Sequence, residues 1–192
     1  MVSGRPDTNE SDAETTVLVV DDESIVRESF SLYLEPHGYD VHTAASGAEA
    51  LRTVDEDTDV VLLDRRMSDR PGDEVLEEIR DRGLGCSIAL VTAVDPDFDI
   101  VEMDCDDYLV KPVDRTDLVE TVERLVLLDD YDEARQELSS LRVKRNVLEV
   151  EKHPAALEDS EEFHRLEDRI ANLEAQLDEL EAEFDRKLGY EG

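Results

Sequence analysis

Residues 17–23 read VLVVDDE, four consecutive apolar residues followed at once by three acids. An unbroken apolar run of this length is typical of a strand that is buried on both faces of a parallel sheet. The pattern of a short apolar run that ends in a polar residue recurs three times, at Val60–Leu63, Ile88–Val91 and Tyr108–Val110. These four stretches predict buried parallel strands.

Segments with helical apolar spacing separate the predicted strands; they are Ile25–Leu34, Ser46–Val54, Gly72–Arg82 and Leu118–Leu128. Pro36 and Gly38 end the first of them, and the alternation in Tyr39–Ala44 predicts one more strand. Strands that alternate with helices predict an α/β fold, here a doubly wound five-stranded parallel sheet.

The residues that end the predicted strands are polar: Asp21, Asp22, Asp64, Thr92 and Lys111. The functional crevice of such a sheet lies outside the carboxyl ends of its strands, so we expect these side chains to share one site. Three adjacent carboxylates repel each other unless a cation neutralises them, and oxygen-only ligands suit Mg²⁺. A carboxylate can also form an aspartyl-phosphate, whose charge a metal, a lysine and a hydroxyl donor would stabilise.

Four motifs together resemble the receiver domain of two-component response regulators over about Thr16–Leu128: VLVVDDE (17–23), LLDRRM (62–67), VTA (91–93) and DDYLVKP (106–112). The resemblance implies a chemotaxis-regulator-like, flavodoxin-like fold and phosphorylation of Asp64 by a sensor histidine kinase. It also implies a Mg²⁺ site, with these ligands: Asp21, Asp22, Asp64 and the backbone carbonyl of Arg66.

The same resemblance implies that Thr92 and Tyr108 form a switch pair, that Lys111 contacts the phosphoryl group, and that the Lys111–Pro112 peptide bond is cis. Two places depart from the family pattern. Ser68 stands where proline is usual, and we expect little consequence. The segment Val94–Cys105 is short and acidic, so we expect the fourth helix of the family fold to be reduced to about one turn, which alters the usual output face.

From Asp129 the apolar residues follow coiled-coil spacing, in two sets that Pro154 separates. The first set, apolar apart from Arg145, is Tyr131, Ala134, Leu138, Leu141, Arg145 and Leu148, and the second is Phe163, Leu166, Ile170, Leu173, Leu177, Leu180 and Phe184. They predict an antiparallel helical hairpin that is joined near Lys152–Ser160. We therefore divide the chain into a disordered acidic lead-in (1–15), a receiver domain (16–128) and an output hairpin (129–192). Two helices alone have a thin core, so we expect self-association or a protein partner.

The hairpin resembles the HalX output module, also called HoxA-like, which follows receivers in haloarchaea and implies transcription regulation. The residues favour output by protein–protein interaction, with a directly DNA-binding regulator as the alternative. Residues 129–192 carry 20 acids and 9 bases, a poor balance for DNA. One basic cluster stands out (Arg142, Lys144, Arg145 and Lys152), and we expect it to pair with acids of the second helix such as Glu174, Asp178 and Glu181.

An enzyme with a separate catalytic domain is disfavoured, because His153 and His164 have no nucleophile or metal-ligand spacing near them. The receiver itself would at most dephosphorylate itself.

Composition leaves two interpretations of a net charge of −33, an acidic disordered chain or a folded protein with an acidic surface. The periodic apolar runs favour the second, and only four lysines beside 53 acids resemble proteins of extreme halophiles. No apolar run approaches the roughly 20 residues of a membrane helix, and Met1–Thr15 lacks the apolar core of a signal peptide. We expect a cytoplasmic protein in which Cys86 and Cys105 are buried thiols and do not bind zinc.

Overall fold

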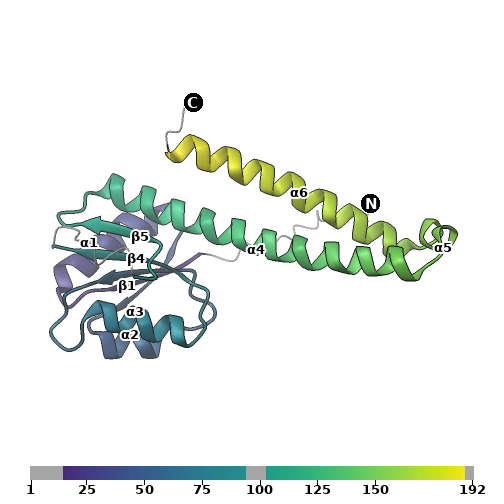
Figure 1. Cartoon of the computed structure of the whole chain (residues 1–192). Helices are drawn as coiled ribbons and strands as arrows, with labels where there is room; N and C mark the ends of the chain where they lie inside the picture. The colour runs from purple at the N-terminus through teal and green to yellow at the C-terminus, as the bar shows by residue number, and fades with distance from the viewer. Residues whose placement is uncertain (1–14, 94–102, 189–192) are drawn as a thin grey trace, which may run out of the picture.

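The computed structural model describes residues 15–93 and 103–188 and has a five-stranded, all-parallel sheet at its centre (Figure 1). The strands are β1 (Thr16–Val20), β2 (Asp40–Ala44), β3 (Val60–Asp64), β4 (Ser87–Thr92) and β5 (Asp107–Val110), and their order in the sheet is β2-β1-β3-β4-β5. This order confirms the predicted doubly wound fold. The expectation of a reduced fourth helix falls mostly on residues 94–102, which lie outside the described residues, as do residues 1–14 of the predicted lead-in.

Helices cover both faces of the sheet, and each buried strand sends its side chains alternately to the two sides. On one face α2 (Gly47–Thr53) and α3 (Gly72–Asp81) pack on a cluster that includes Leu18, Val61 and Leu63. On the other face α1 (Ser24–Leu34), which the short helix η1 (Glu35–His37) follows, and the start of α4 (Arg115–Glu151) pack on residues such as Val17, Val19 and Leu62. Because both faces are covered, the strands have unbroken apolar runs.

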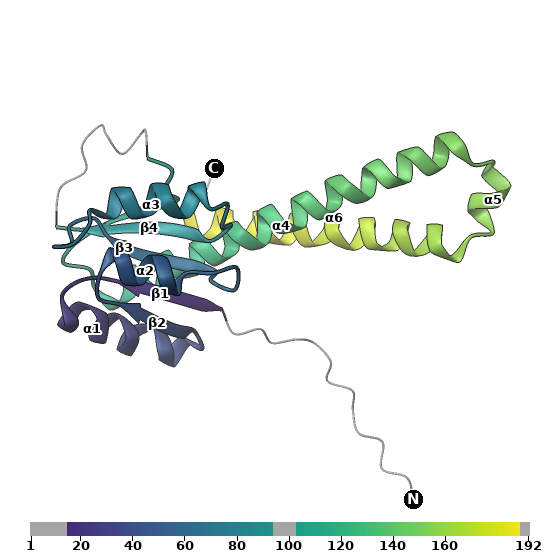
Figure 2. The same cartoon turned by 90° about the horizontal axis from the view of Figure 1, so that it is seen from below.

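The helix after the sheet does not end with the receiver. The predicted helix Leu118–Leu128 and the first predicted hairpin helix are one helix, α4, of 37 residues. It runs straight through the predicted domain boundary at residues 128 and 129, and then extends beyond the sheet (Figures 1 and 2). The Asp114 side chain caps its start by accepting a hydrogen bond from the Asp117 amide at 2.9 Å.

The predicted hairpin is completed by α5 (Pro154–Glu158) in the connection and α6 (Glu161–Leu188), which returns antiparallel to α4 (Figure 2). Its core consists of Ala134, Leu138, Ile170 and Leu173, with Leu141, Leu166 and Leu177 partly buried around them. The Tyr131 and Phe184 rings meet edge to face, with centroids 6.4 Å apart. The two predicted apolar sets therefore pack mainly against each other.

Ion pairs line the edges of this hairpin. Arg142 lies 2.8 Å from Glu174, as predicted, and Arg169 lies 2.5 Å from Glu137. Two other residues that were expected to form ion pairs between α4 and α6 have different partners. Arg145 pairs with Glu149 on its own helix at 3.8 Å, and Glu181 accepts a hydrogen bond from Tyr131 at 2.9 Å. The bases of α4 thus have fewer partners on α6 than the sequence suggests.

Two further expectations concern membranes and thiols. None of the helices in the described part of the chain has the length and hydropathy needed to cross a membrane. Cys86 is buried, which raises the pKa of its thiol to about 11, whereas Cys105 is only partly buried.

Gly72, at the start of α3, generates a prediction. Its amide donates to the Arg65 carbonyl at 2.9 Å, and an added Cβ would lie 2.3 Å from the Asp64 carbonyl oxygen and 2.8 Å from the Arg65 Cα. Because only backbone could move to relieve this overlap, we expect Gly72→Ala to lower the free energy of unfolding by about 1–3 kcal/mol. Urea unfolding in molar KCl measures this. Gly85→Ala is the matched control, since a Cβ there meets nothing within 4 Å, and equal stability of the two variants would contradict the prediction.

Candidate functional site

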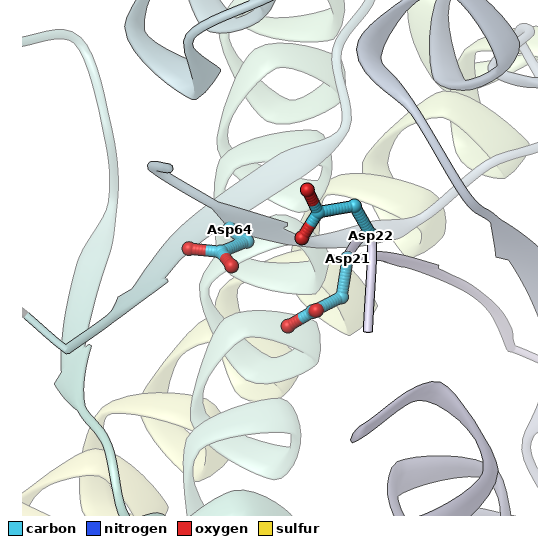
Figure 3. Close-up of side chains that lie close together, drawn as sticks. All are labelled: Asp21, Asp22 and Asp64. Carbon is cyan, nitrogen blue, oxygen red and sulfur yellow. The ribbon is translucent and has the colours of Figure 1, made fainter. Parts of the chain in front are cut away.

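The candidate site lies at the carboxyl ends of β1 and β3, which are neighbours in the sheet although the chain visits β2 between them. The strand order reverses at this point, which is where doubly wound sheets form a crevice. Asp21 follows β1 directly, Asp22 comes next, and Asp64 is the last residue of β3. Figure 3 shows the three side chains converging, and one oxygen of each lies within 4.8 Å of the others. The structure therefore brings together the three carboxylates that the sequence singled out.

One backbone amide orients each of these carboxylates. Asp21 accepts from the Glu23 amide at 2.8 Å, and Asp64 accepts from the Arg66 amide at 3.0 Å. Asp22 accepts from the Ser68 amide at 3.0 Å. Asp21 and Asp64 are only 2% and 5% exposed, whereas Asp22 is exposed. The site is therefore a buried pair of acids with a third acid at its mouth.

Lys111 directly follows β5, the edge strand that β4 separates from β3, and reaches this pair from the same carboxyl edge of the sheet. Its ammonium nitrogen lies 2.5 Å from an oxygen of Asp21 and 2.8 Å from an oxygen of Asp64. Burial raises the pKa of Asp21, even though the hydrogen bonds from Lys111 and from the Glu23 amide oppose that rise. Burial alone would lower the pKa of Lys111, but its hydrogen bonds to the two carboxylates outweigh this and raise it. The lysine therefore stays charged. The Lys111–Pro112 bond beside it is cis, as the resemblance implies.

Thr92 and Tyr108 lie on the two strands next to the site. Thr92 is the last residue of β4 and is fully buried, and its carbonyl accepts from the Lys111 amide at 2.7 Å. Tyr108 lies in β5, half-buried against the cluster under α2 and α3. The predicted switch residues thus flank the lysine, and their switching role stays a prediction.

Sequence reasoning missed two residues of the loop after β3. Ser68 was expected to have little consequence, but its amide holds Asp22, and a proline in its place would have no N–H to donate. Asp69 accepts from the amides of Gly47 and Ala48, both at 3.1 Å, and so caps α2. These backbone hydrogen bonds outweigh desolvation and lower the pKa of Asp69. Serine in place of the usual proline at position 68 was the one feature of the sequence that could have indicated the role of this loop.

Comparisons with known proteins agree with this geometry. Residues 17–123 match the family model of the response regulator receiver domain, and residues 127–191 match the HalX domain. A Haloferax volcanii protein named as a transcriptional regulator is 43% identical over 190 residues, which is 96% of this chain and 32% of that protein. The transcriptional regulatory protein PhoP of Bacillus subtilis is 40% identical over 50% of this chain and 42% of its own length. The chain therefore spans less than half the length of these curated relatives.

Two solved structures share the fold. The receiver domain protein of Methanospirillum hungatei is 27% identical with a TM-score of 0.59, and covers 62% of this chain and 98% of its own. The response regulator TrrA of Thermotoga maritima, solved in complex with Mg²⁺ and BeF, is 35% identical with a TM-score of 0.52, and covers 58% of this chain and 98% of its own. The chain belongs to the response regulator receiver domain family, with a HalX domain after the receiver.

Proposed function

We propose that this protein accepts a phosphoryl group on Asp64 from a sensor histidine kinase and transmits the change through its helical hairpin to a protein partner. The observation that carries this proposal is the cluster of Asp21, Asp22 and Asp64, in which Asp21 and Asp64 form ion pairs with the ammonium group of Lys111. Such a site combines a carboxylate nucleophile with a fixed cation, which is what transfer of a phosphoryl group to a carboxylate requires.

The donor set fits Mg²⁺. All candidate ligands are oxygens, and the exposed Asp22 leaves room for water, as Mg²⁺ prefers. We propose that Asp21, Asp22, Asp64 and the backbone carbonyl of Arg66 hold the ion, and the Mg²⁺–BeF complex of the related TrrA supports this assignment. When bound, the ion would neutralise negative charge on the phosphoryl oxygens.

The residues of the chain supply the remaining steps. An oxygen of Asp64 attacks phosphorus, a new O–P bond forms, and the bond from phosphorus to the kinase histidine nitrogen breaks, with its electron pair left on nitrogen. Lys111, already 2.8 Å from Asp64, would donate to an oxygen of the incoming group. The Arg66 amide fixes the Asp64 carboxylate from the other side at 3.0 Å. No separate catalytic domain takes part in this scheme.

Output would pass from β5 to α4. The Thr92 hydroxyl would shift toward the phosphoryl group and donate a hydrogen bond to it. The Tyr108 ring would then move into the space that the hydroxyl leaves. Asp107, next to Tyr108, forms an ion pair with Arg124 of α4. The adjacent Glu123 lies 3.0 Å from Lys187 at the end of α6, so both helices of the hairpin are connected to the switching strand.

Direct DNA binding is the second candidate, and the names of the two curated relatives favour it. The acid excess of residues 129–192 opposes it, and in concentrated salt a sparse basic cluster gains little from counterion release. Tight, sequence-selective binding at molar salt that is lost on changing Arg142, Lys144 and Arg145 to alanine would establish this alternative.

The first prediction concerns the phosphoacceptor. Incubation with acetyl phosphate and Mg²⁺ should add one acid-labile phosphoryl group to the wild type and none to Asp64→Asn, because the amide is a far weaker nucleophile. Intact mass measures this. Asp57→Asn, an exposed loop acid, should behave as the wild type. Equal labelling of Asp64→Asn would remove Asp64 from the mechanism.

The second prediction concerns the metal. Asp22→Ala removes one hard ligand, so we expect Mg²⁺ affinity to fall by at least about tenfold, measured by calorimetry. Ser68→Ala keeps the amide that holds Asp22 and should bind nearly as the wild type, whereas Ser68→Pro loses that amide and should bind more weakly. Unchanged affinity in Asp22→Ala would rule out this ligand set.

The third prediction concerns the switch. Thr92→Ala should still take up phosphate but should not change hydrogen exchange around Tyr108, because the hydroxyl that couples the two is gone. Thr92→Ser, which keeps the hydroxyl, should restore the change. A normal phosphorylation-dependent change in Thr92→Ala would contradict the coupling.

A further inference from the structure

Arg65, the residue directly after Asp64, reaches toward the start of α3. In β3 the side chains of Val61 and Leu63 pack on the face of the sheet that α2 and α3 cover, and strand alternation directs residue 65 to the same face. A guanidinium group on this largely apolar face needs an ionic partner. Asp73, in the first turn of α3, supplies it.

The two side chains meet at two points. Nε of Arg65 donates to Oδ1 of Asp73 at 2.9 Å, and Nη2 donates to Oδ2 at 3.1 Å. This pairing of two planar groups fixes the angle between them as well as the distance. The Arg65 side chain is 15% exposed. The arginines that pair with Glu78 on the same helix, Arg70 and Arg82, are 38% and 39% exposed. Water and salt therefore weaken the contact of Arg65 less than these other contacts of α3.

The peptide unit that joins Arg65 to Arg66 lies between this ion pair and Asp64. Its carbonyl oxygen accepts from the Gly72 amide at 2.9 Å, and its N–H donates to Oδ1 of Asp64 at 3.0 Å. Because a peptide unit is planar, its carbonyl and its N–H turn together. The Gly72 amide, one residue before Asp73, therefore sets the direction of the N–H that Asp64 accepts.

The start of α3 rests directly on the backbone around Asp64. A Cβ on Gly72 would lie 2.3 Å from the Asp64 carbonyl oxygen and 2.8 Å from the Arg65 Cα, so no side chain separates the helix from the strand end. Pro71 precedes the helix and makes no side-chain cap. The ion pair of Arg65 with Asp73 is the side-chain contact that holds this first turn of α3 to the end of β3.

The two oxygens of the Asp64 carboxylate have different partners. Oδ1 accepts from the Arg66 amide, and Oδ2 lies 2.8 Å from the Lys111 ammonium nitrogen. If the peptide unit turned, Oδ1 would lose its donor, and the carboxylate would then rotate about its contact with Lys111. Transfer of a phosphoryl group requires a nucleophile in a defined position, and a displacement of about 1 Å can lower a rate by about a hundredfold.

We propose that the ion pair between Arg65 and Asp73 orients the Asp64 carboxylate through the peptide unit of residues 65 and 66. Arg65 and Asp73 are then positioning residues for phosphoryl uptake. They hold the first turn of α3 in place, and with it the Gly72 amide on the Arg65 carbonyl. Neither side chain belongs to the cluster of three acids, so the pair acts on the nucleophile without contacting the phosphoryl group. This inference rests on the proposed phosphorylation of Asp64.

The rate of labelling by acetyl phosphate tests the proposal on the full chain in molar KCl, at a Mg²⁺ concentration that saturates each variant. Asp73→Ala should lower the rate constant at least about tenfold, because it removes the pair and leaves the acid cluster and Lys111 intact. Glu74→Ala is the matched control and should label as the wild type, since Glu74 is an exposed acid in the same first turn. An unchanged rate in Asp73→Ala would overturn the proposal. An equal loss in both variants would also overturn it, because the cause would then be charge at the helix start.

A double-mutant cycle determines whether the two side chains act through each other. If they do, Arg65→Ala combined with Asp73→Ala should label no more slowly than Arg65→Ala alone. Arg65→Lys keeps the charge next to Asp64 but cannot hold two oxygens in one plane, so it should recover only part of the rate. Losses that multiply in the double variant, or full recovery by lysine, would overturn the positioning role.

The Arg66 amide provides a measurement that does not depend on phosphorylation. Its hydrogen exchange, followed by NMR, should be faster in Asp73→Ala than in the wild type and in Glu74→Ala, because its bond to Asp64 is weakened. Unchanged exchange would overturn the proposal. This measurement also separates the two proposals: a wild type that takes up no phosphoryl group rejects the phosphoryl role of Asp64, and the exchange of the Arg66 amide then decides alone whether the pair orients that carboxylate.

Discussion

The ammonium group of Lys111 holds together two buried carboxylates that would otherwise repel each other. Lys111 follows β5, Asp21 follows β1 and Asp64 ends β3, so the two ion pairs of Lys111 connect the carboxyl ends of three strands. Lys111 opposes the rise that burial causes in the pKa of Asp21, and its hydrogen bonds to the two carboxylates raise its own pKa. Lys111 follows β5, which carries Tyr108 and pairs with β4, the strand that ends at Thr92.

Much of this site could be predicted from the sequence because strand ends carry its residues. Runs such as Val17–Val20 are apolar on both faces, so their ends are easily located, and parallel strands place their carboxyl ends at one edge. The side-chain types at those ends then suggest the chemistry. What could not be predicted is the contribution of backbone amides. The Ser68 amide that holds Asp22, and the amides that Asp69 caps, depend on loop paths that no side-chain pattern encodes.

The continuity of α4 was also hidden in the sequence. Asp129, Asp130, Asp132 and Glu133 interrupt the apolar pattern and resemble a boundary between domains. The structure shows that they are helical and that the apolar face changes sides. Before the interruption the helix packs on the sheet through Leu118 and Leu125, and after it the helix packs on α6 through Ala134 and Leu138. Apolar periodicity predicts one buried face for each helix. It therefore does not predict a helix that buries different faces in its first and second parts.

Because α4 is one continuous helix, the number of residues between the part that packs on the sheet and the part that packs on α6 sets the rotation of the hairpin about the helix axis, relative to the receiver. Each residue adds about 100° of rotation and about 1.5 Å of advance. One residue inserted between Leu127 and Ala134 would turn the hairpin by more than a quarter of a circle about the receiver, whereas seven would leave its direction nearly unchanged. The junction therefore fixes the helical phase between receiver and hairpin, and insertions there can be accommodated only in steps close to whole turns.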